Sequence, residues 1–130
     1  MGGMPDRERA RVVEALKHEI SVTHDGHINT GFLATKFFFE TLTDNGLHDV
    51  AVGAMRKEDF PSYGYWIKQG ATTTWEQWDC QNSHNHPMFG GGLTWFYRRL
   101  AGICTDPSEP GYKHIILRPY PVQNLENVHY

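Results

Sequence analysis

Glu76 is flanked by two of the four tryptophans of this 130-residue chain, in the stretch GATTTWEQWDC at residues 70–80. Glycoside hydrolysis usually needs two carboxyl groups, one that protonates the leaving oxygen and one that activates water or attacks the sugar. Aromatic faces beside such a carboxylate can stack on a sugar ring and exclude water. The pattern suggests a working carboxylate with Trp75 and Trp78 as sugar platforms. A polar residue between two buried tryptophans fits the same pattern.

His84 and His86 follow on the same segment. Two imidazoles at this spacing could bind a metal together with Asp79 or Cys80, because zinc takes nitrogen, sulfur and carboxylate ligands. The cluster lacks a third ligand at a diagnostic spacing, so we predict no metal site and no cofactor. A neutral imidazole that hydrogen-bonds a sugar hydroxyl fits better, because a sugar site needs both donors and acceptors.

Three aromatic residues lie between glycines in PSYGYWIKQG, residues 61–70. They could line a pocket, and we predict Tyr65 as a substrate-binding residue. Anchoring of the loop onto the helices is the expected role for at least two of the three. Asp79 is expected to have a structural role, and Arg98–Arg99 to form a solvated or ion-paired face.

Four helical patterns must position these residues, at residues 5–20, 29–43, 47–57 and 87–101. The second is apolar around most of its circumference, which is typical of an inner helix that is buried on more than one side. The first and the last each carry one apolar stripe, formed by Val12, Val13, Leu16 and Ile20 and by Phe89, Leu93, Phe96, Leu100 and Ile103. Residues 58–86 are predicted as a long irregular segment, and loops of that length are usually functional.

After Thr105 the sequence changes to the turn-rich linker DPSEPG, and KHIILRPYPV then predicts a strand whose prolines suit an edge or a strand end. One strand cannot be stable alone, and no partner strand is recognisable in the sequence. Both ends of the chain are therefore expected to be cut, as in a fragment of a larger protein.

Composition and charge exclude several classes of partner. The chain has 12 basic and 15 acidic residues, whereas nucleic acids and anionic membranes attract clustered basic residues. No apolar run approaches the roughly 20 residues that cross a bilayer. The polar N-terminus MGGMPDRERARVV has no signal peptide, so the sequence leaves the compartment open. The two cysteines do not make a disulfide scaffold.

Four ordered segments resemble the α-L-rhamnosidases of glycoside hydrolase family 78, and they cover nearly the whole chain. They are GHINTGFLATKFFFETLTDNG, DFPSYGYWIKQGATTTWEQWD, NSHNHPMFGGGLTWFYRRLAGI and PGYKHIILRP. The resemblance implies a mainly α fold, namely the C-terminal portion of an (α/α)6 six-hairpin toroid over residues 1–104. A linker and the first strand or strands of a β-sandwich would follow over residues 105–130.

The resemblance also implies hydrolysis of terminal α-L-rhamnose from glycosides or polysaccharides, with inversion at the anomeric carbon. Glu76 matches the general base that activates water, and His86 matches a residue that binds the rhamnose. The family's general acid lies upstream in an acidic motif, and residues 1–27 hold no counterpart of it. The chain is therefore expected to act with the remainder of a parent enzyme. The alternative is a non-catalytic carbohydrate-binding or interaction module that lacks the acid.

Overall fold

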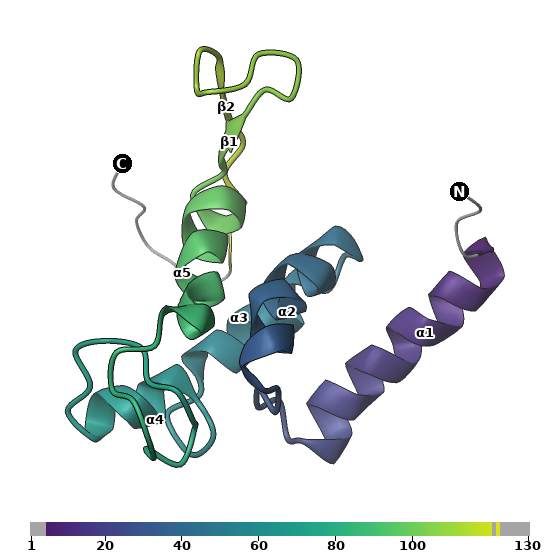
Figure 1. Cartoon of the computed structure of the whole chain (residues 1–130). Helices are drawn as coiled ribbons and strands as arrows, with labels where there is room; N and C mark the ends of the chain where they lie inside the picture. Colours follow the sequence, from purple (N-terminus) through teal and green to yellow (C-terminus); the bar gives the residue numbers. More distant parts are fainter. Residues whose placement is uncertain (1–4, 121, 123–130) are drawn as a thin grey trace.

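The computed structural model describes residues 5–120 and 122, which form a mainly helical chain with one short two-stranded sheet (Figure 1). The elements are α1 (Asp6–His18), α2 (Phe32–Asp44), α3 (His48–Arg56), α4 (Tyr63–Lys68), α5 (Gly91–Trp95), β1 (Ile103–Thr105) and β2 (Ile115–Leu117). π-Helical turns extend α1 over Glu19–Thr23 and α5 over Phe96–Leu100, and a 3₁₀ turn over Pro87–Gly90 precedes α5. None of the helices in the described ranges is long and apolar enough to cross a membrane.

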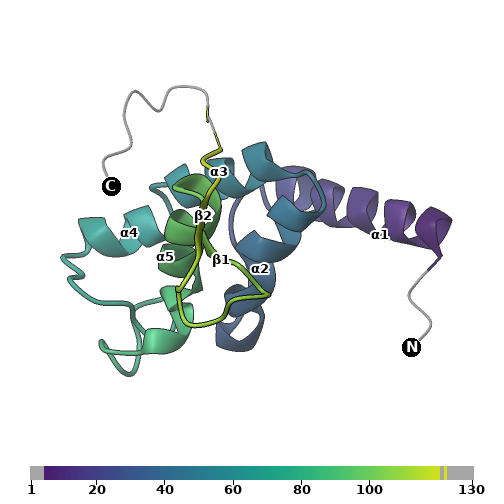
Figure 2. The same ribbon diagram turned by 90° about the horizontal axis from the view of Figure 1, so that it is seen from above.

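Helix α1 projects away from the other helices and packs on them at its C-terminal end (Figures 1 and 2). Acidic residues in its first turn and basic residues in its last turn complement the helix dipole. Of the predicted apolar stripe, Ile20 is buried and Leu16 is half-buried, whereas Val12 is 54% exposed. The helix predicted from the sequence is confirmed, and its stripe becomes more buried from Val12 toward Ile20.

The main core lies where α2, α3 and α5 meet. Phe39 and Leu42 of α2, Ala51 of α3 and Trp95 of α5 are all at most 1% exposed. Trp95 packs against Phe39 with ring centroids 5.2 Å apart. Its Nε1 donates to the Thr43 hydroxyl over 2.7 Å, and that hydroxyl donates to the Phe39 carbonyl over 2.9 Å. The buried indole N–H and the buried hydroxyl are therefore both satisfied.

Ion pairs join the π-helical turn that follows α5 to α2. Arg99 Nε lies 2.5 Å from a Glu40 carboxylate oxygen, and its Nη2 lies 2.7 Å from Asp44. Arg98 Nη1 is 3.6 Å from Glu40. The ion-paired role expected for these two arginines is confirmed.

The predicted all-round apolar character of α2 is present, but one side of the helix faces solvent in the described chain. Phe38 is buried, whereas Leu33 and Phe37 are 68% and 61% exposed. Leu93 of α5, which the sequence pattern assigned to a buried stripe, is 63% exposed. Apolar surface of this kind usually contacts another polypeptide or a ligand.

The helix predicted over residues 87–101 is present, but its predicted buried stripe is partly wrong. Phe89 and Leu100 are buried as expected, whereas Phe96 is 40% exposed and Trp95 is fully buried. The backbone changes from 3₁₀ to α to π geometry along this segment. A stripe drawn with one helical period cannot follow such a change, because each geometry has a different number of residues per turn.

The segment over residues 58–86, expected to be irregular, contains the short helix α4. The Ser62 hydroxyl caps this helix by accepting the Tyr65 N–H over 2.9 Å. Gly64 is required inside it, since a Cβ there would lie 2.4 Å from the Lys57 carbonyl oxygen. A helix this short spans too few turns for an apolar period to be recognised in the sequence.

Strands β1 and β2 pair antiparallel, with Ile103 opposite Leu117 and Thr105 opposite Ile115. The strand predicted after the turn-rich linker is confirmed. The expectation that it lacks a partner was wrong, because the partner precedes the linker and had been assigned to the end of the helix pattern. The predicted domain boundary between residues 104 and 105 falls inside β1.

Gly102 connects α5 to β1 with a left-handed backbone, at a φ of +71°. A Cβ at this position would lie 2.0 Å from the Arg118 carbonyl oxygen. The Arg118 N–H donates to the Gly102 carbonyl over 2.9 Å, so the chain after β2 lies directly against this glycine. Both the backbone conformation and the close approach therefore require glycine.

We predict that Gly102→Ala lowers the free energy of unfolding more than Gly46→Ala does. Both glycines have positive φ, so alanine carries a left-handed penalty of roughly 1–2 kcal/mol at either position. A methyl group at Gly46 meets nothing within 4 Å, whereas at Gly102 it overlaps the Arg118 carbonyl. Urea denaturation followed by circular dichroism measures both losses, and equal losses would contradict the close approach.

Candidate functional site

The loop over residues 73–86 folds back on itself and carries Glu76 on one arm and His86 on the other. The Glu76 N–H donates to the Ser83 carbonyl over 2.8 Å, and the His86 N–H donates to the Thr74 carbonyl over 2.7 Å. The two arms are thus paired through the backbone, which brings the two candidate side chains together.

Two of the three threonines that lead into this loop reinforce the pairing. The Thr73 hydroxyl donates to the His84 carbonyl, and the Thr74 hydroxyl donates to the His86 carbonyl over 2.7 Å. Thr72 is exposed. The threonine run therefore holds the loop closed, a role that the sequence pattern did not reveal.

The tip of the loop is a tight turn. Cys80 and Asn82 have positive φ, at 66° and 64°. Asparagine tolerates this conformation, but cysteine rarely adopts it. Asp79 accepts the Gln81 N–H over 3.2 Å, which is a local turn contact. The structural role expected for Asp79 is confirmed.

Glu76, the candidate base, and His86, the candidate sugar-binding residue, lie side by side. The Glu76 Oε2 lies 3.9 Å from the His86 Nδ1, and the same oxygen accepts the Ser83 N–H over 3.1 Å. The Glu76 side chain is 32% exposed, so water can reach it. A carboxylate that is fixed in direction and open to water can take a proton from that water.

The His86 ring is held between the carboxylate and an aromatic edge. Phe32, the first residue of α2, meets it in a T-shaped contact with ring centroids 5.9 Å apart. The His86 Nε2 is buried and makes no hydrogen bond with the described residues. Such an atom is destabilising unless a partner satisfies it, and a ligand hydroxyl is one partner of suitable chemistry.

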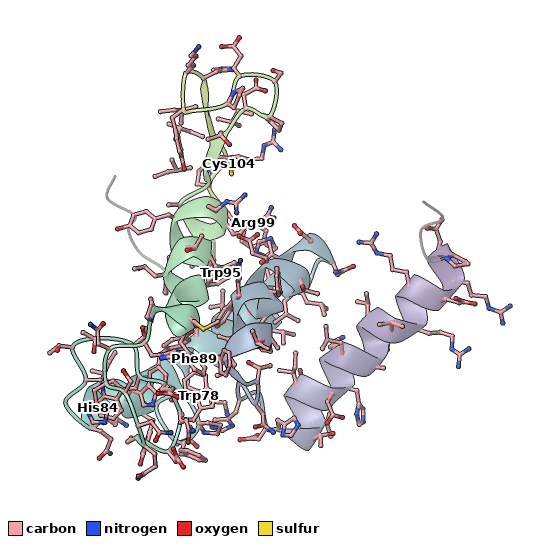
Figure 3. All side chains as sticks on the ribbon, viewed as in Figure 1. Trp78, His84, Phe89, Trp95, Arg99 and Cys104 are labelled. Atoms are coloured by element: carbon pink, nitrogen blue, oxygen red, sulfur yellow. The ribbon has the colours of Figure 1, made fainter. Side chains whose placement is uncertain are left out.

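The tryptophans of the WEQW stretch both pack against the protein. Trp78 stacks on Trp66 with centroids 4.4 Å apart, and it lies beside Phe89 (Figure 3). The Trp78 Nε1 donates to the Thr30 carbonyl over 2.9 Å. Trp75 is 6% exposed, and the centroid of its ring lies 6.1 Å from that of Trp66. These rings anchor the loop, and sugar contact by Trp75 or Trp78 stays a prediction.

The aromatic residues of α4 divide between anchoring and exposure. The Tyr63 hydroxyl donates to the Phe89 carbonyl over 2.5 Å, and burial raises the pKa of its phenol. Trp66 is buried, so the anchoring role expected for at least two of the three residues is confirmed for these two. Tyr65 is half-buried with its ring against Phe60, and its substrate-binding role stays a prediction.

His84 contacts Trp75 and Cys80. Its ring stacks on Trp75 with centroids 4.0 Å apart and planes 10° apart, and its Nε2 bonds the Cys80 carbonyl over 3.0 Å. Burial raises the pKa of the Cys80 thiol. Over residues 5–120 and 122, no three His, Cys, Asp or Glu side chains are grouped to hold a metal ion. The alternative metal site therefore has no support in the described geometry.

Two apolar cavities lie near the loop, but neither contains Glu76 or His86. One of about 480 Å³ reaches Thr74 and Phe89, and another of about 560 Å³ runs along α2 past Phe32 and Pro87. The side chains of His86 and Glu76 are 26% and 32% exposed, so an enclosed sugar site around them needs walls from further residues.

Ser83 and Phe32 contact the pair, and the sequence pointed to neither. Ser83 acts through its backbone N–H and carbonyl, which every residue except proline possesses. Phe32 belongs to a helix with apolar residues on every side, so its particular neighbour could not be identified from periodicity. Their contributions become visible only in the folded structure, where the loop lies against the start of α2.

Known proteins resemble this chain over nearly its whole length. The model of the bacterial alpha-L-rhamnosidase six-hairpin glycosidase domain matches residues 1–100. Two alpha-L-rhamnosidases, from Streptomyces avermitilis and Formosa agariphila, are 37% and 38% identical over 93% and 75% of the chain. The chain covers only 12% and 11% of those two proteins.

Solved structures give the same result. The alpha-L-rhamnosidase from Dictyoglumus thermophilum superposes with a TM-score of 0.83 at 40% identity over 93% of the chain. The enzyme from Aspergillus terreus superposes with a TM-score of 0.73 at 30% identity over 84% of the chain. The chain covers 14% of each of these two structures.

We predict that Thr74→Val loosens the loop, whereas Thr72→Val does not. Valine keeps the shape of threonine but removes the hydroxyl that donates to the His86 carbonyl. The loss should cost about 1 kcal/mol of local stability. Hydrogen exchange at the His86 N–H, which bonds the Thr74 carbonyl, measures the opening of the loop. Unchanged protection in Thr74→Val would show that the hydroxyl contributes nothing.

Proposed function

Because the chain belongs to the family of bacterial α-L-rhamnosidase six-hairpin glycosidase domains, we propose that it supplies the water-activating part of an inverting α-L-rhamnosidase site. Glu76 is the general base, and the general acid comes from the remainder of a parent enzyme. The observation that carries the proposal is the Glu76–His86 pair, a water-accessible carboxylate 3.9 Å from an imidazole within the matched segment.

The proposed reaction begins with the direction of the carboxylate. The Ser83 N–H binds Glu76 Oε2, which leaves Oε1 to accept a proton from water. That water attacks the anomeric carbon from the face opposite the leaving oxygen. The general acid protonates the leaving oxygen as the glycosidic bond breaks. An inverting pair keeps its carboxyl groups roughly 6.5–9.5 Å apart, so that the water fits between base and sugar.

His86 is proposed to bind the sugar. Its Nδ1 faces the base, while its buried Nε2 has no partner among the described residues. A hydroxyl of a terminal rhamnose would satisfy Nε2 and hold the anomeric carbon near Glu76. Trp75, Trp78 and Tyr65 are proposed to shape the same site, with the two tryptophans acting through the packed loop.

The division of the chain into two parts is also a proposal. Residues 1–104 would belong to the helical toroid, and residues 105–130 would form a linker and the beginning of a β-sandwich. The family match ends at residue 100, and the β1–β2 pair follows it directly. These two observations support a change of architecture close to the proposed boundary.

We expect Glu76→Gln to abolish most turnover of p-nitrophenyl α-L-rhamnoside. The measurement uses the longer polypeptide that combines these residues with the rest of the six-hairpin domain. An amide cannot accept the water proton, so kcat should fall by about 10²–10⁴-fold, as for other acid–base groups. Glu14→Gln, on the exposed α1 surface, is the matched control and should leave kcat unchanged.

Two outcomes would contradict this assignment. Near wild-type turnover in Glu76→Gln would show that Glu76 is not the base. The anomer released first, followed by NMR, tests the stereochemistry separately: an α-product before mutarotation would indicate retention and a covalent intermediate instead of direct attack by water.

Sugar binding without catalysis is the second candidate function. It is favoured by the unpartnered His86 Nε2 together with the absence of an acidic motif from residues 1–27. Under this function the chain would retain the sugar-contacting half of the site and would have lost the acid.

We expect millimolar L-rhamnose to change the tryptophan fluorescence of the 130-residue chain in a saturable way, because Trp75 adjoins Glu76 in the loop. His86→Ala should remove the response, since it deletes the atom proposed to bond the sugar hydroxyl. L-Mannose, which carries a hydroxymethyl group where L-rhamnose has a methyl group, serves as the comparison sugar. A flat titration with L-rhamnose would exclude binding by this chain alone.

A further inference from the structure

We propose that His84 is a positioning residue, which fixes the direction of the Glu76 carboxylate through Ser83 and the ring of Trp75. This inference rests on the proposed role of Glu76 as the general base. It concerns a side chain other than those of Glu76 and His86, to which the resemblance to known rhamnosidases gave no role.

Two backbone contacts make the carboxylate depend on the position of Ser83. The Glu76 N–H donates to the Ser83 carbonyl over 2.8 Å, and the Ser83 N–H donates to Glu76 Oε2 over 3.1 Å. The second bond is the hydrogen bond by which the described residues orient the carboxylate. A shift of Ser83 would therefore turn the oxygen that faces the water.

His84, the next residue, is held by three contacts. Its ring stacks on Trp75 at 4.0 Å, its Nε2 bonds the Cys80 carbonyl over 3.0 Å, and its own carbonyl accepts the Thr73 hydroxyl. Trp75 is a firm support because it is buried in a cluster with Trp66 and Phe89. Figure 3 shows His84 on the outer part of this loop, away from the helical core. These contacts hold the residue next to Ser83 to the tip of the loop at Cys80 and to the opposite arm of the loop at Thr73 and Trp75.

The turn needs such contacts. Cys80 and Asn82 both adopt left-handed backbone conformations, which L-residues rarely adopt without support from their surroundings. The bond from His84 to the Cys80 carbonyl closes the turn across these two residues. A carbonyl oxygen only accepts, so Nε2 carries the proton and the bond persists whether the ring is neutral or charged.

His84 is proposed to act on the reaction indirectly. Its described contacts are with Trp75, Cys80 and Thr73, and Glu76 is reached only through the neighbouring backbone. His84 is exposed, so direct contact with a sugar is the competing explanation. The two explanations differ in whether the effect of His84 requires the Glu76 carboxylate.

The experiment is a double-mutant cycle in the longer polypeptide that combines these residues with the rest of the six-hairpin domain. His84→Ala should lower kcat by about ten- to a hundredfold, the size of effect that misplacement of a catalytic group produces. KM should change by less than about threefold, because the ground-state contacts of the sugar remain. In the Glu76→Gln background, His84→Ala should cause no further loss, since there is no base left to position.

The division of the effect between kcat and KM gives an independent readout. Misplacement of the base lowers kcat with little change in KM, whereas loss of a direct sugar contact raises KM. His18→Ala, a substitution of an exposed histidine on α1, is the matched control and should leave both kcat and KM unchanged.

Two conservative variants keep the test valid if His84→Ala fails to fold or if Glu76→Gln is too slow to measure. His84→Gln retains a donor for the Cys80 carbonyl, and His84→Phe retains the stack on Trp75. Each should restore part of kcat. Equal rates in all His84 variants and wild type would overturn the inference.

The remaining outcomes separate the inference from the function on which it rests. An undiminished effect of His84→Ala in the Glu76→Gln background would identify His84 as a direct contact of the sugar and overturn its positioning role. Retention of turnover by Glu76→Gln would reject the base assignment and the inference together. Loss in Glu76→Gln with a silent His84 would reject the inference alone.

Discussion

The stacked pair of Trp66 and Trp78 joins three segments that are distant in the sequence. Trp78 lies in the loop, Trp66 lies in α4, and the Trp78 N–H reaches Thr30 before α2. The Trp66 N–H donates to the Trp78 carbonyl, so both indoles are satisfied while their faces are packed. Large aromatic surfaces contribute strongly to core stability. The position of the loop, and with it Glu76, depends on this stack.

A rigid support of this kind suits the chemistry proposed for the loop. A general base is effective when it is aimed before the substrate arrives, because no free energy is then spent on reorientation during the reaction. Here the carboxylate is aimed by a backbone amide, and the amide is held by a loop whose tryptophans are packed into the protein. Aromatic residues beside a glycosidase carboxylate can thus serve the sugar indirectly, by keeping the loop in place.

The sequence predicted those elements whose pattern extends over several turns. Helix α1 follows from its apolar stripe and α2 from its apolar circumference, and Glu76 and His86 follow from their place among four ordered motifs. Strand β1 was not predicted because Ile103 also fits the apolar stripe of the preceding helix, and its pairing with β2 depends on residues beyond a turn-rich linker. The exposure of Phe37 escaped because an all-round apolar helix does not indicate which neighbours are present. The hydrogen bond from Ser83 to Glu76 was not predicted, because almost every residue has a backbone N–H and the residue type therefore does not reveal it.

The spans of the contacts around the loop imply an order of folding. The bond from Ser83 to Glu76 and the bond from Thr74 to His86 join residues 7 and 12 positions apart. Loops of this size close in about 10–100 ns, so the arms can meet early. The bond from Trp78 to Thr30 spans 48 positions, and its closure entropy makes such contacts slow to form. Thr30 leaves the ribosome before Trp78 does, so the fast-closing loop emerges when its distant docking partner has already been synthesised.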